Sequence, residues 1–264
     1  MRLSHAARTD VGMKRDNNED NFLAFPEQNL WAVFDGMGGH AAGEVASGIA
    51  VQELKEFYEM TGKDPDATWP FRDSRELSYD ENRLVTSIKL ANARIIETAN
   101  QDARKKSMGT TCVSAHFLDR KGTPTALVAH TGDSRVYRFR GTKLTRVTID
   151  HSLVEEYLRM GKINEEEAKN FPQKNIILRA LGQIDKIDVE IHAYELEAGD
   201  VYLLCSDGLS GMIEDNVMES ITSWLPMASN CMPQTARSRS GVSRLPSKYT
   251  RPCTDGGKAA RKSA

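Results

Sequence analysis

The chain of 264 residues is predicted to be an α+β protein, and three observations support this fold class. Short apolar runs end at Gly or Asp, as strands commonly do. Most of these runs follow one another without a helix between them, which favours antiparallel sheets over a parallel βαβ arrangement. Two long amphipathic segments are adjacent in the chain, so we expect their helices to pack on the outside of the sheets.

The first part of the chain is predicted to contain three short strands, over residues 3–9, 21–25 and 30–34. Two helices are expected next, over 42–58 and 80–104, because apolar residues recur there at a spacing of about 3.6. A loop rich in Pro, Asp and Ser joins the two helices.

The second part is dense in strands, which are predicted over 110–118, 124–131, 134–140, 143–148, 187–192 and 200–206. Gly122 and Gly141 provide turns between neighbouring strands. Short helices are expected within 151–182, and a last amphipathic segment is expected over 214–225.

The formal net charge of −2 hides an uneven distribution of charge. Residues 225–264 carry eight basic residues and one acid, which leaves 27 basic and 36 acidic residues in 1–224. The tail has four of the nine prolines and few large apolar residues, so it cannot bury enough apolar area to offset its ordering entropy. We therefore predict a folded domain over 1–224 and a basic, disordered tail over 225–264.

Several classes of protein are disfavoured by composition. An acidic body argues against a nucleic-acid binder, which needs a basic face for the phosphates. No run of about 18 apolar residues occurs, so no membrane span is expected. The first residues lack an apolar signal core, and the four cysteines form no CxxC pair. A cytoplasmic location is expected.

Four acidic motifs point to chemistry, and three of them lie at the edge of a predicted strand. They are Asn18-Glu19-Asp20, Phe34-Asp35-Gly36, Gly132-Asp133-Ser134 and Ser206-Asp207-Gly208. Hard divalent cations prefer oxygen ligands, and two cations about 3.5–4 Å apart can share a carboxylate. Each Asp could instead be a turn residue. The repetition at Asp35 and Asp207, each between an apolar run and a Gly, favours the metal interpretation.

The glycine-rich run over 35–43 also matches a loose dinucleotide-binding pattern. The carboxylate of Asp35 would repel a pyrophosphate there unless a cation intervened. The surrounding sequence also lacks the serial βαβ units of a dinucleotide fold. The dinucleotide interpretation is therefore disfavoured.

Seven motifs of the chain resemble, in the same order, those of the bacterial type 2C protein phosphatases, which are metal-dependent serine/threonine phosphatases. They are residues 9–20 (TDVGMKRDNNED), 33–40 (VFDGMGGH), 109–111 (GTT), 130–136 (HTGDSRV), 150–152 (DHS), 178–182 (LRALG) and 204–208 (LCSDG). The resemblance covers about residues 3–224, the part of the chain predicted to form the catalytic domain.

The resemblance implies a four-layer α-β-β-α sandwich, in which two antiparallel sheets are flanked by helices. It also implies two Mn²⁺ or Mg²⁺ ions, with a third bound more weakly. A water that bridges the two cations would hydrolyse phosphoserine and phosphothreonine in proteins directly, without a phosphoenzyme. The expected partners are phosphoproteins, with a serine/threonine kinase and its substrates among them.

The resemblance also assigns roles to the acidic motifs. Asp35 would bridge the two cations, Gly36 would offer its backbone carbonyl to one, and Asp207 would bind the other. Glu19 would ligate a cation directly or through water, and Asp20 would hold the network of bound water.

Two more roles concern the substrate and the third cation. Arg15 would bind the substrate phosphate through its planar guanidinium, or be a solvated surface charge. Asp133 would support the third cation, or only cap a turn. Residues 149–181 match the flap, which contacts substrate. Arg135 and Arg179 are expected to form structural ion pairs, and His151 is expected to form local hydrogen bonds. His40 is expected to be a surface residue, with a general acid for the leaving alkoxide as the alternative.

The resemblance stops near Trp224. The family ends with Gly-Gly-x-Asp-Asn and an apolar strand, and the Asp of this motif ligates the same cation as Asp207. The chain lacks the pattern, because Asp215-Asn216 comes too early and Asp255-Gly256-Gly257 reverses the order. Our hypothesis is that the residues from about 225 onward are out of frame. Translation of the gene's other two frames tests it, and the hypothesis fails if neither frame contains the motif.

The missing ligand keeps a second function open, namely a catalytically weak phosphatase-fold module that binds a kinase or a phosphoprotein. The retained Arg15, Glu19, Asp20, Asp35 and Asp207 favour the enzyme. The basic tail is either a solvated segment or a tether for an acidic partner.

Overall fold

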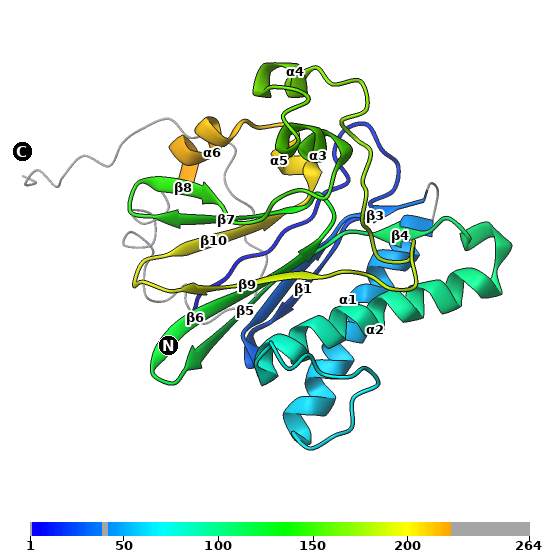
Figure 1. Cartoon of the computed structure of the whole chain (residues 1–264), viewed down its shortest axis with the longest axis vertical. Coiled ribbons are helices and arrows are strands. Elements are labelled where there is room, and N and C mark those ends of the chain that lie inside the picture. Colours follow the sequence, from blue (N-terminus) through cyan, green and yellow to red (C-terminus); the bar gives the residue numbers. More distant parts are fainter. Residues whose placement is uncertain (1, 39–41, 223–264) are drawn as a thin grey trace, which may run out of the picture. The chain divides into compact units, whose positions relative to one another are not determined.

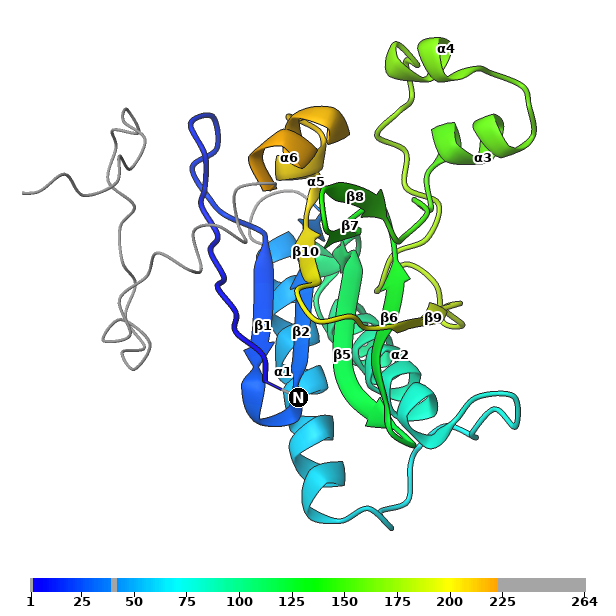
Figure 2. The ribbon, with the colours of Figure 1, turned by 90° about the vertical axis from the view of Figure 1, so that its left-hand side faces the viewer.

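The first sheet is built around a long hairpin of β5 (Cys112–Arg120) and β6 (Thr123–Thr131). The computed structural model describes residues 2–38 and 42–222. In it the sheet has the order β1-β2-β5-β6-β9, and every neighbouring pair is antiparallel. The three other strands of this sheet are β1 (Asn21–Phe25), β2 (Leu30–Phe34) and β9 (Glu190–Glu195). Figure 1 labels β1 and β9, and Figure 2 labels all three.

A second antiparallel sheet has the order β10-β7-β8. Its strands are β7 (Arg135–Arg140), β8 (Lys143–Arg146) and β10 (Val201–Cys205). A short ladder of β3 (Gly36–Met37) and β4 (Gly109–Thr110) is separate from both sheets.

Two long helices, α1 (Ala42–Lys63) and α2 (Tyr79–Gln101), pack on the outer face of the first sheet. Figure 2 shows them behind the strands of that sheet. Leu54 and Ile88 are fully buried there against Phe34 and Leu127 of the sheet. The helix α2 begins with a capping box at Ser78, which satisfies free backbone N–H groups of its first turn.

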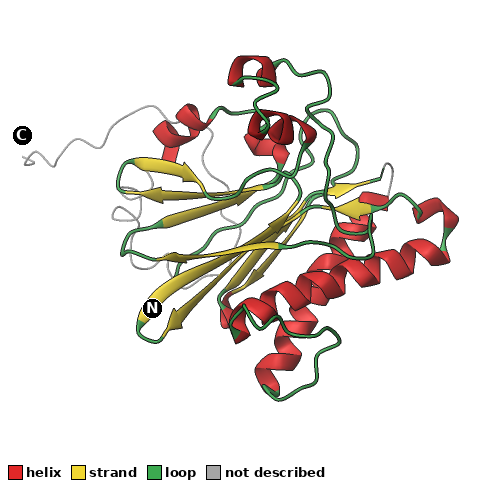
Figure 3. Cartoon of the chain, in the orientation of Figure 1, coloured by secondary structure: helices red, strands yellow, loops and turns green. Residues whose placement is uncertain are grey.

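The two sheets face each other across a second apolar layer. Val113 and Val128 of the first sheet pack with Val136 of the second. On the outer face of the second sheet, Tyr137 and Cys205 pack against α5 (Asp207–Ser210) and α6 (Asp215–Thr222). This order of helices, sheet, sheet and helices confirms the predicted α+β class and the four-layer sandwich (Figure 3).

The flap, residues 149–181, contains α3 (Leu153–Arg159) and α4 (Glu165–Lys169), which confirms the prediction of short helices. Two 3-10 turns, η1 (Pro26–Gln28) and η2 (Ala103–Lys105), complete the described elements. The predicted helix over 80–104 ends at Gln101, where Asp102 takes an extended conformation and caps η2.

The predicted strand over 3–9 is wrong, since no described strand pairs with this segment. Side-chain contacts hold this segment instead. Leu3 packs against the apolar cluster that contains Phe117, and the His5 ring contacts the Trp31 ring at a tilted angle. An apolar pattern alone does not make a strand, because the backbone also needs a hydrogen-bonded partner.

The strand predicted over 187–192 begins later, at Glu190, where the ladder with His130 starts. Ile187 and Val189 precede this ladder in the chain and are buried in the apolar core between the first sheet and the helices α1 and α2. Their apolar character therefore reflects packing and not strand pairing.

The described residues, 2–38 and 42–222, belong to one compact unit. The predictions for 225–264, namely the disordered tail and the shifted reading frame, lie outside the described residues. His40 and Asp255 also lie outside them.

Candidate metal centre

Asp35 lies directly after β2, a strand that is paired on both sides. The Asp35 N–H donates to Thr111 Oγ1 at 3.0 Å. Its carbonyl accepts hydrogen bonds from the Thr111 N–H and the Thr110 hydroxyl, each at 2.9 Å. These three bonds fix the backbone from which the Asp35 carboxylate leaves the sheet.

The loop that carries Asp133 is held by the same threonine. Thr111 Oγ1 and Ser134 Oγ are 2.7 Å apart. A Cβ on Gly132 would lie 2.7 Å from Thr111 Cβ, and Gly132 has a φ of +107°, so both space and backbone conformation require glycine here. Thr111 therefore sets the separation between Asp35 and this loop.

Asp35 lies among the carboxylates of three other chain segments. Burial raises the pKa of Asp35 to about 9, and the charges of Asp20 and Asp207 add to this effect. A hydrogen bond with Asp207 and the charge of Asp133 act in the same direction. The pKa of Asp133 is raised to about 6, first by burial and then by the charges of Asp207 and Asp150. Such carboxylates repel one another unless protons or cations compensate them.

A serine joins two of these segments. Ser206 Oγ donates to Asp20 Oδ2 at 2.7 Å, across 186 positions of sequence. Ser206 follows β10 and directly precedes Asp207, the first residue of α5. The bond therefore ties the Asn18-Glu19-Asp20 motif to the Ser206-Asp207-Gly208 motif.

Glu19 lies where the start of α1 passes β3. Ser47 Oγ on α1 donates to the Glu19 carbonyl at 2.7 Å. A Cβ on Gly36 would lie 2.5 Å from that carbonyl oxygen, and a Cβ on Gly43 would lie 2.9 Å from the Glu19 carboxyl carbon. Both positions therefore need glycine, and the Glu19 side chain is held beside Gly36.

Arg15 lies at the exposed edge of the site. Its side chain is 67% exposed, and its Nη1 is 3.9 Å from Oε2 of Glu19. The guanidinium is thus close to Glu19 and open to an anion from solvent.

The side-chain donors of this cluster are all carboxylate oxygens, from Glu19, Asp20, Asp35, Asp133 and Asp207. A donor set of oxygen atoms suits Mg²⁺ and Mn²⁺ and does not suit metals that prefer thiolate or imidazole. The residues present therefore fit the cations that the sequence resemblance implies.

Two arginines form the ion pairs that were expected of them. Arg135 Nη2 lies 2.7 Å from Oδ2 of the buried Asp150. Arg179 Nη1 lies 3.4 Å from Oδ2 of Asp188. His151 is buried and hydrogen-bonded, which confirms the prediction of a local hydrogen-bonding role.

Asp215 lies away from the carboxylate cluster, on the outer face of the second sheet. The Tyr137 hydroxyl donates to Asp215 Oδ1 at 2.9 Å. This position agrees with the view that Asp215-Asn216 comes too early in the chain to supply the final ligand.

Sequence reasoning missed the hydroxyl groups that hold the acids. They belong to Ser47, Thr110, Thr111, Ser134 and Ser206. All except Ser47 lie inside the motifs that carry the resemblance. The signal was present, but the partner of a hydroxyl group cannot be derived from its position in the chain.

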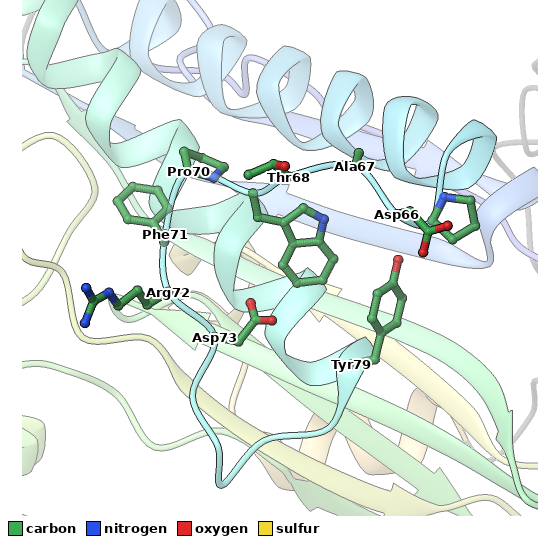
Figure 4. A pocket seen from close by; sticks show the side chains of 10 residues that line it. Asp66, Ala67, Thr68, Pro70, Phe71, Arg72, Asp73 and Tyr79 are labelled. Atoms are coloured by element: carbon green, nitrogen blue, oxygen red, sulfur yellow. The ribbon is translucent and has the colours of Figure 1, made fainter.

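Two of the hollows that the described residues line occur outside the cluster of acids. One, of about 450 Å³, lies in the loop between α1 and α2, where Figure 4 shows Asp66, Asp73 and Tyr79 around it. The other, of about 130 Å³, lies at the base of the flap beside His151 and Glu190. Neither contains a residue of the carboxylate cluster.

None of the helices in the described ranges is both long enough and apolar enough to cross a membrane.

Comparisons with a family model and with known sequences point to the same protein family. The model of the family described as "Protein phosphatase 2C" matches residues 13–240, which extends beyond Trp224. Serine/threonine phosphatase stp of Listeria monocytogenes is 39% identical over 217 residues, which cover 81% of each chain. Protein phosphatase PhpP of Streptococcus pneumoniae is 35% identical over 224 residues, covering 83% of this chain and 85% of PhpP.

Solved structures agree with this result. The serine/threonine phosphatase PstP/Ppp of Mycobacterium tuberculosis is 35% identical, with a TM-score of 0.67 over 81% of this chain and 83% of that one. A PstP catalytic domain in complex with two manganese ions is also 35% identical, with a TM-score of 0.64 over 81% and 82%.

Proposed function

The chain belongs to the type 2C protein phosphatase family, and from this premise we propose that Asp35, Asp207 and Glu19 hold its two cations. The chain is a metal-dependent serine/threonine phosphatase that acts on phosphoproteins and uses Mn²⁺ or Mg²⁺. The proposal concerns which of its residues hold the cations and bind the substrate phosphate.

In the proposed centre Asp35 would serve both cations, Gly36 would contribute its backbone carbonyl, and Asp207 would hold the second cation. Glu19 binds directly or through water, and Asp20 orders the surrounding water. When bound, the cations lower the pKa of a water molecule and neutralise charge on the phosphoryl oxygens.

The observation that carries this assignment is the gathering of acids from three other chain segments around Asp35. Buried carboxylates that also feel one another's charge are unfavourable, and burial together with the charges of Asp20, Asp207 and Asp133 raises the pKa of Asp35. A fold that brings them together therefore favours divalent cations between them. The hydrogen bond from Ser206 to Asp20 supports it, because a hydroxyl orders a carboxylate without neutralising it.

Two residues complete the proposal. The exposed guanidinium of Arg15 binds the substrate phosphate, since its planar fork matches two phosphate oxygens. Asp133, held on the loop beside Thr111, supports a third and weaker cation.

The test measures hydrolysis of p-nitrophenyl phosphate and of a phosphothreonine peptide with Mn²⁺, with Mg²⁺ and with EDTA. Asp35→Asn keeps the size of the side chain and removes its charge. Several kcal/mol of transition-state stabilisation depend on the cations, so the rate should fall at least about 100-fold. The matched control is Asp73→Asn, an exposed acid of the loop between α1 and α2. Unchanged turnover in Asp35→Asn would overturn the assignment.

A second function stays open because the final acidic motif of the family is not found in the sequence. In it the chain is a catalytically weak module that binds a kinase or a phosphoprotein. Phosphopeptide binding without cation-dependent turnover in the unmodified chain would favour this alternative.

We also propose that the chain opposes a serine/threonine kinase by acting on the kinase and its substrates, in the cytoplasm. Opposition to a kinase is supported by the hydrolysis of phosphoproteins, because a kinase forms the phosphate esters that a phosphatase removes. The free, buried thiols of Cys112 and Cys205 support the cytoplasmic location, because they suit a reducing compartment.

A further inference from the structure

A buried histidine joins the flap to the loop that carries Asp133. The His151 N–H donates to the Gly132 carbonyl at 2.9 Å, and the Gly132 N–H donates to His151 Nδ1 at 3.2 Å. The His151 carbonyl accepts a hydrogen bond from the Leu178 N–H at 2.7 Å. His151 lies near the start of the flap and Leu178 near its end, so both ends of the flap meet the Asp133 loop at this residue.

The hydrogen-bond partners of His151 determine its protonation. Since Nδ1 accepts an N–H, the ring proton is on Nε2, which donates to Glu190 Oε2 at 3.2 Å. His130 stacks on this ring at a centroid distance of 4.7 Å, and its Nε2 donates to the Ile149 carbonyl at 2.9 Å. Burial lowers the pKa of both imidazoles, which keeps them neutral at neutral pH.

The Asp133 loop is thus held from two sides. Thr111 contacts Gly132 and Ser134 from the side of Asp35. His151 holds Gly132 from the side of the flap. The Nδ1 atom is the only part of the His151 side chain in this contact, and it can accept the Gly132 N–H only while it carries no proton.

We propose that His151 is a positioning residue for the dephosphorylation reaction. Its Nδ1 lone pair holds the Gly132–Ser134 loop against the base of the flap, and so places Asp133 relative to the phosphoprotein that the flap contacts. This inference rests on the proposed function, because it takes Asp133 to support the third cation.

A metal site formed by His130, His151 and Glu190 is the competing interpretation, since their ligand atoms lie within 4.8 Å of one another. The hydrogen bonds argue against it. Nε2 of each imidazole carries a proton, and Nδ1 of His151 already accepts a hydrogen bond from the Gly132 N–H. The two rings are also only 19° from parallel, so their in-plane lone pairs do not converge on one point.

The test compares two substitutions in the full chain. His151→Phe keeps the shape of the ring and removes the acceptor. His151→Asn keeps an acceptor oxygen in the position of Nδ1. Hydrogen exchange of peptides covering 132–134 and 176–178 reports whether the loop and the flap base are held. The KM for a phosphothreonine peptide and the half-saturating concentration of Mn²⁺ report on positioning.

In His151→Phe we expect faster exchange in both peptides, and a KM and Mn²⁺ midpoint raised about tenfold, as for other residues that orient a metal ligand. In His151→Asn these quantities should stay near those of the unmodified chain. A purely structural role would lower the active fraction, and therefore kcat, without moving KM or the Mn²⁺ midpoint.

The proposal is overturned if the Phe and Asn variants behave alike in exchange and in Mn²⁺ midpoint. If His151→Phe does not fold, His151→Gln takes its place, because its amide lies one bond further out and cannot replace Nδ1. Lack of Mn²⁺-dependent turnover in the unmodified chain would instead contradict the proposed function, while the exchange comparison would still decide the role of His151.

Discussion

Neutral hydroxyl groups hold the Asp20 carboxylate and the backbone of Asp35 in the candidate metal centre. Asp20 accepts a hydrogen bond from the Ser206 hydroxyl, and the backbone of Asp35 is held by Thr110 and Thr111. A lysine or arginine in these positions would neutralise the acids and compete with a cation. Hydroxyl groups fix the geometry and leave the negative charge available.

Stability of the metal-free protein should therefore fall as pH rises. Folded Asp35 keeps its proton up to about pH 9, whereas its ordinary pKa is 3.8. Asp133 adds the same effect between 3.8 and about 6. Because the folded state binds more protons than the unfolded state over this range, the free energy of unfolding decreases with rising pH.

Urea unfolding in EDTA between about pH 5 and pH 8 measures this effect, which should exceed about 1 kcal/mol. The Asp35→Asn variant is the control, and its dependence on pH should be clearly flatter. Equal slopes in the two proteins would show that Asp35 is not the group responsible.

At the scale of elements, the bounds of helices and strands were predicted best where an apolar pattern extends over several residues. The strands over 21–25 and 30–34 were predicted to the residue, and α1 and α2 begin within one residue of the expected positions. The strands β3 and β4 were missed, because two residues have no readable periodicity. The two strands pair through Gly36 with Thr110 and Met37 with Gly109, which is a tertiary contact between distant segments.

The helix α1 offers a matched pair of glycines for testing its close approach to Gly36. A Cβ at Gly43 would lie 2.8 Å from the Gly36 carbonyl carbon, whereas a Cβ at Gly48 would meet only Asn21 at 3.9 Å. Gly43→Ala should destabilise the fold by about 1–3 kcal/mol through overpacking and should weaken Mn²⁺-dependent turnover. Gly48→Ala should stabilise the fold by about 0.5–1 kcal/mol, because alanine favours a helix interior.

Chemical denaturation and the Mn²⁺ dependence of turnover measure the two glycine variants. If Gly43→Ala is as stable and as active as Gly48→Ala, the close approach of α1 to Gly36 has no part in the site.

At the scale of the whole catalytic unit, the sandwich is what assembles the centre. Ser206 and Asp20 are separated by 186 positions and joined by one hydrogen bond of 2.7 Å. Asp35 follows β2 of the first sheet, and Asp207 comes shortly after β10 of the second sheet. Folding therefore works against the repulsion of its own acids, and a cation bound to the folded state should relieve it.

Mn²⁺ should accordingly raise the stability of the whole unit. A ligand that binds only the folded state at 100 times its dissociation constant adds about 2.7 kcal/mol to the free energy of unfolding. Urea unfolding with increasing Mn²⁺ measures this gain, and Asp207→Asn should reduce it. A midpoint that is independent of Mn²⁺ would contradict cation binding by the folded chain.

The sequence by itself determined the family and the two long helices, because these depend on local patterns and on motif order. It also identified Arg15, Glu19, Asp20, Asp35, Asp133 and Asp207 as candidates. Only the tertiary structure decided what holds them, since hydroxyl groups from distant segments meet these acids only after the sheets have packed. It also decided that 3–9 is not a strand and that His151 faces Gly132, because hydrogen-bond partners are set by proximity in space and not along the chain.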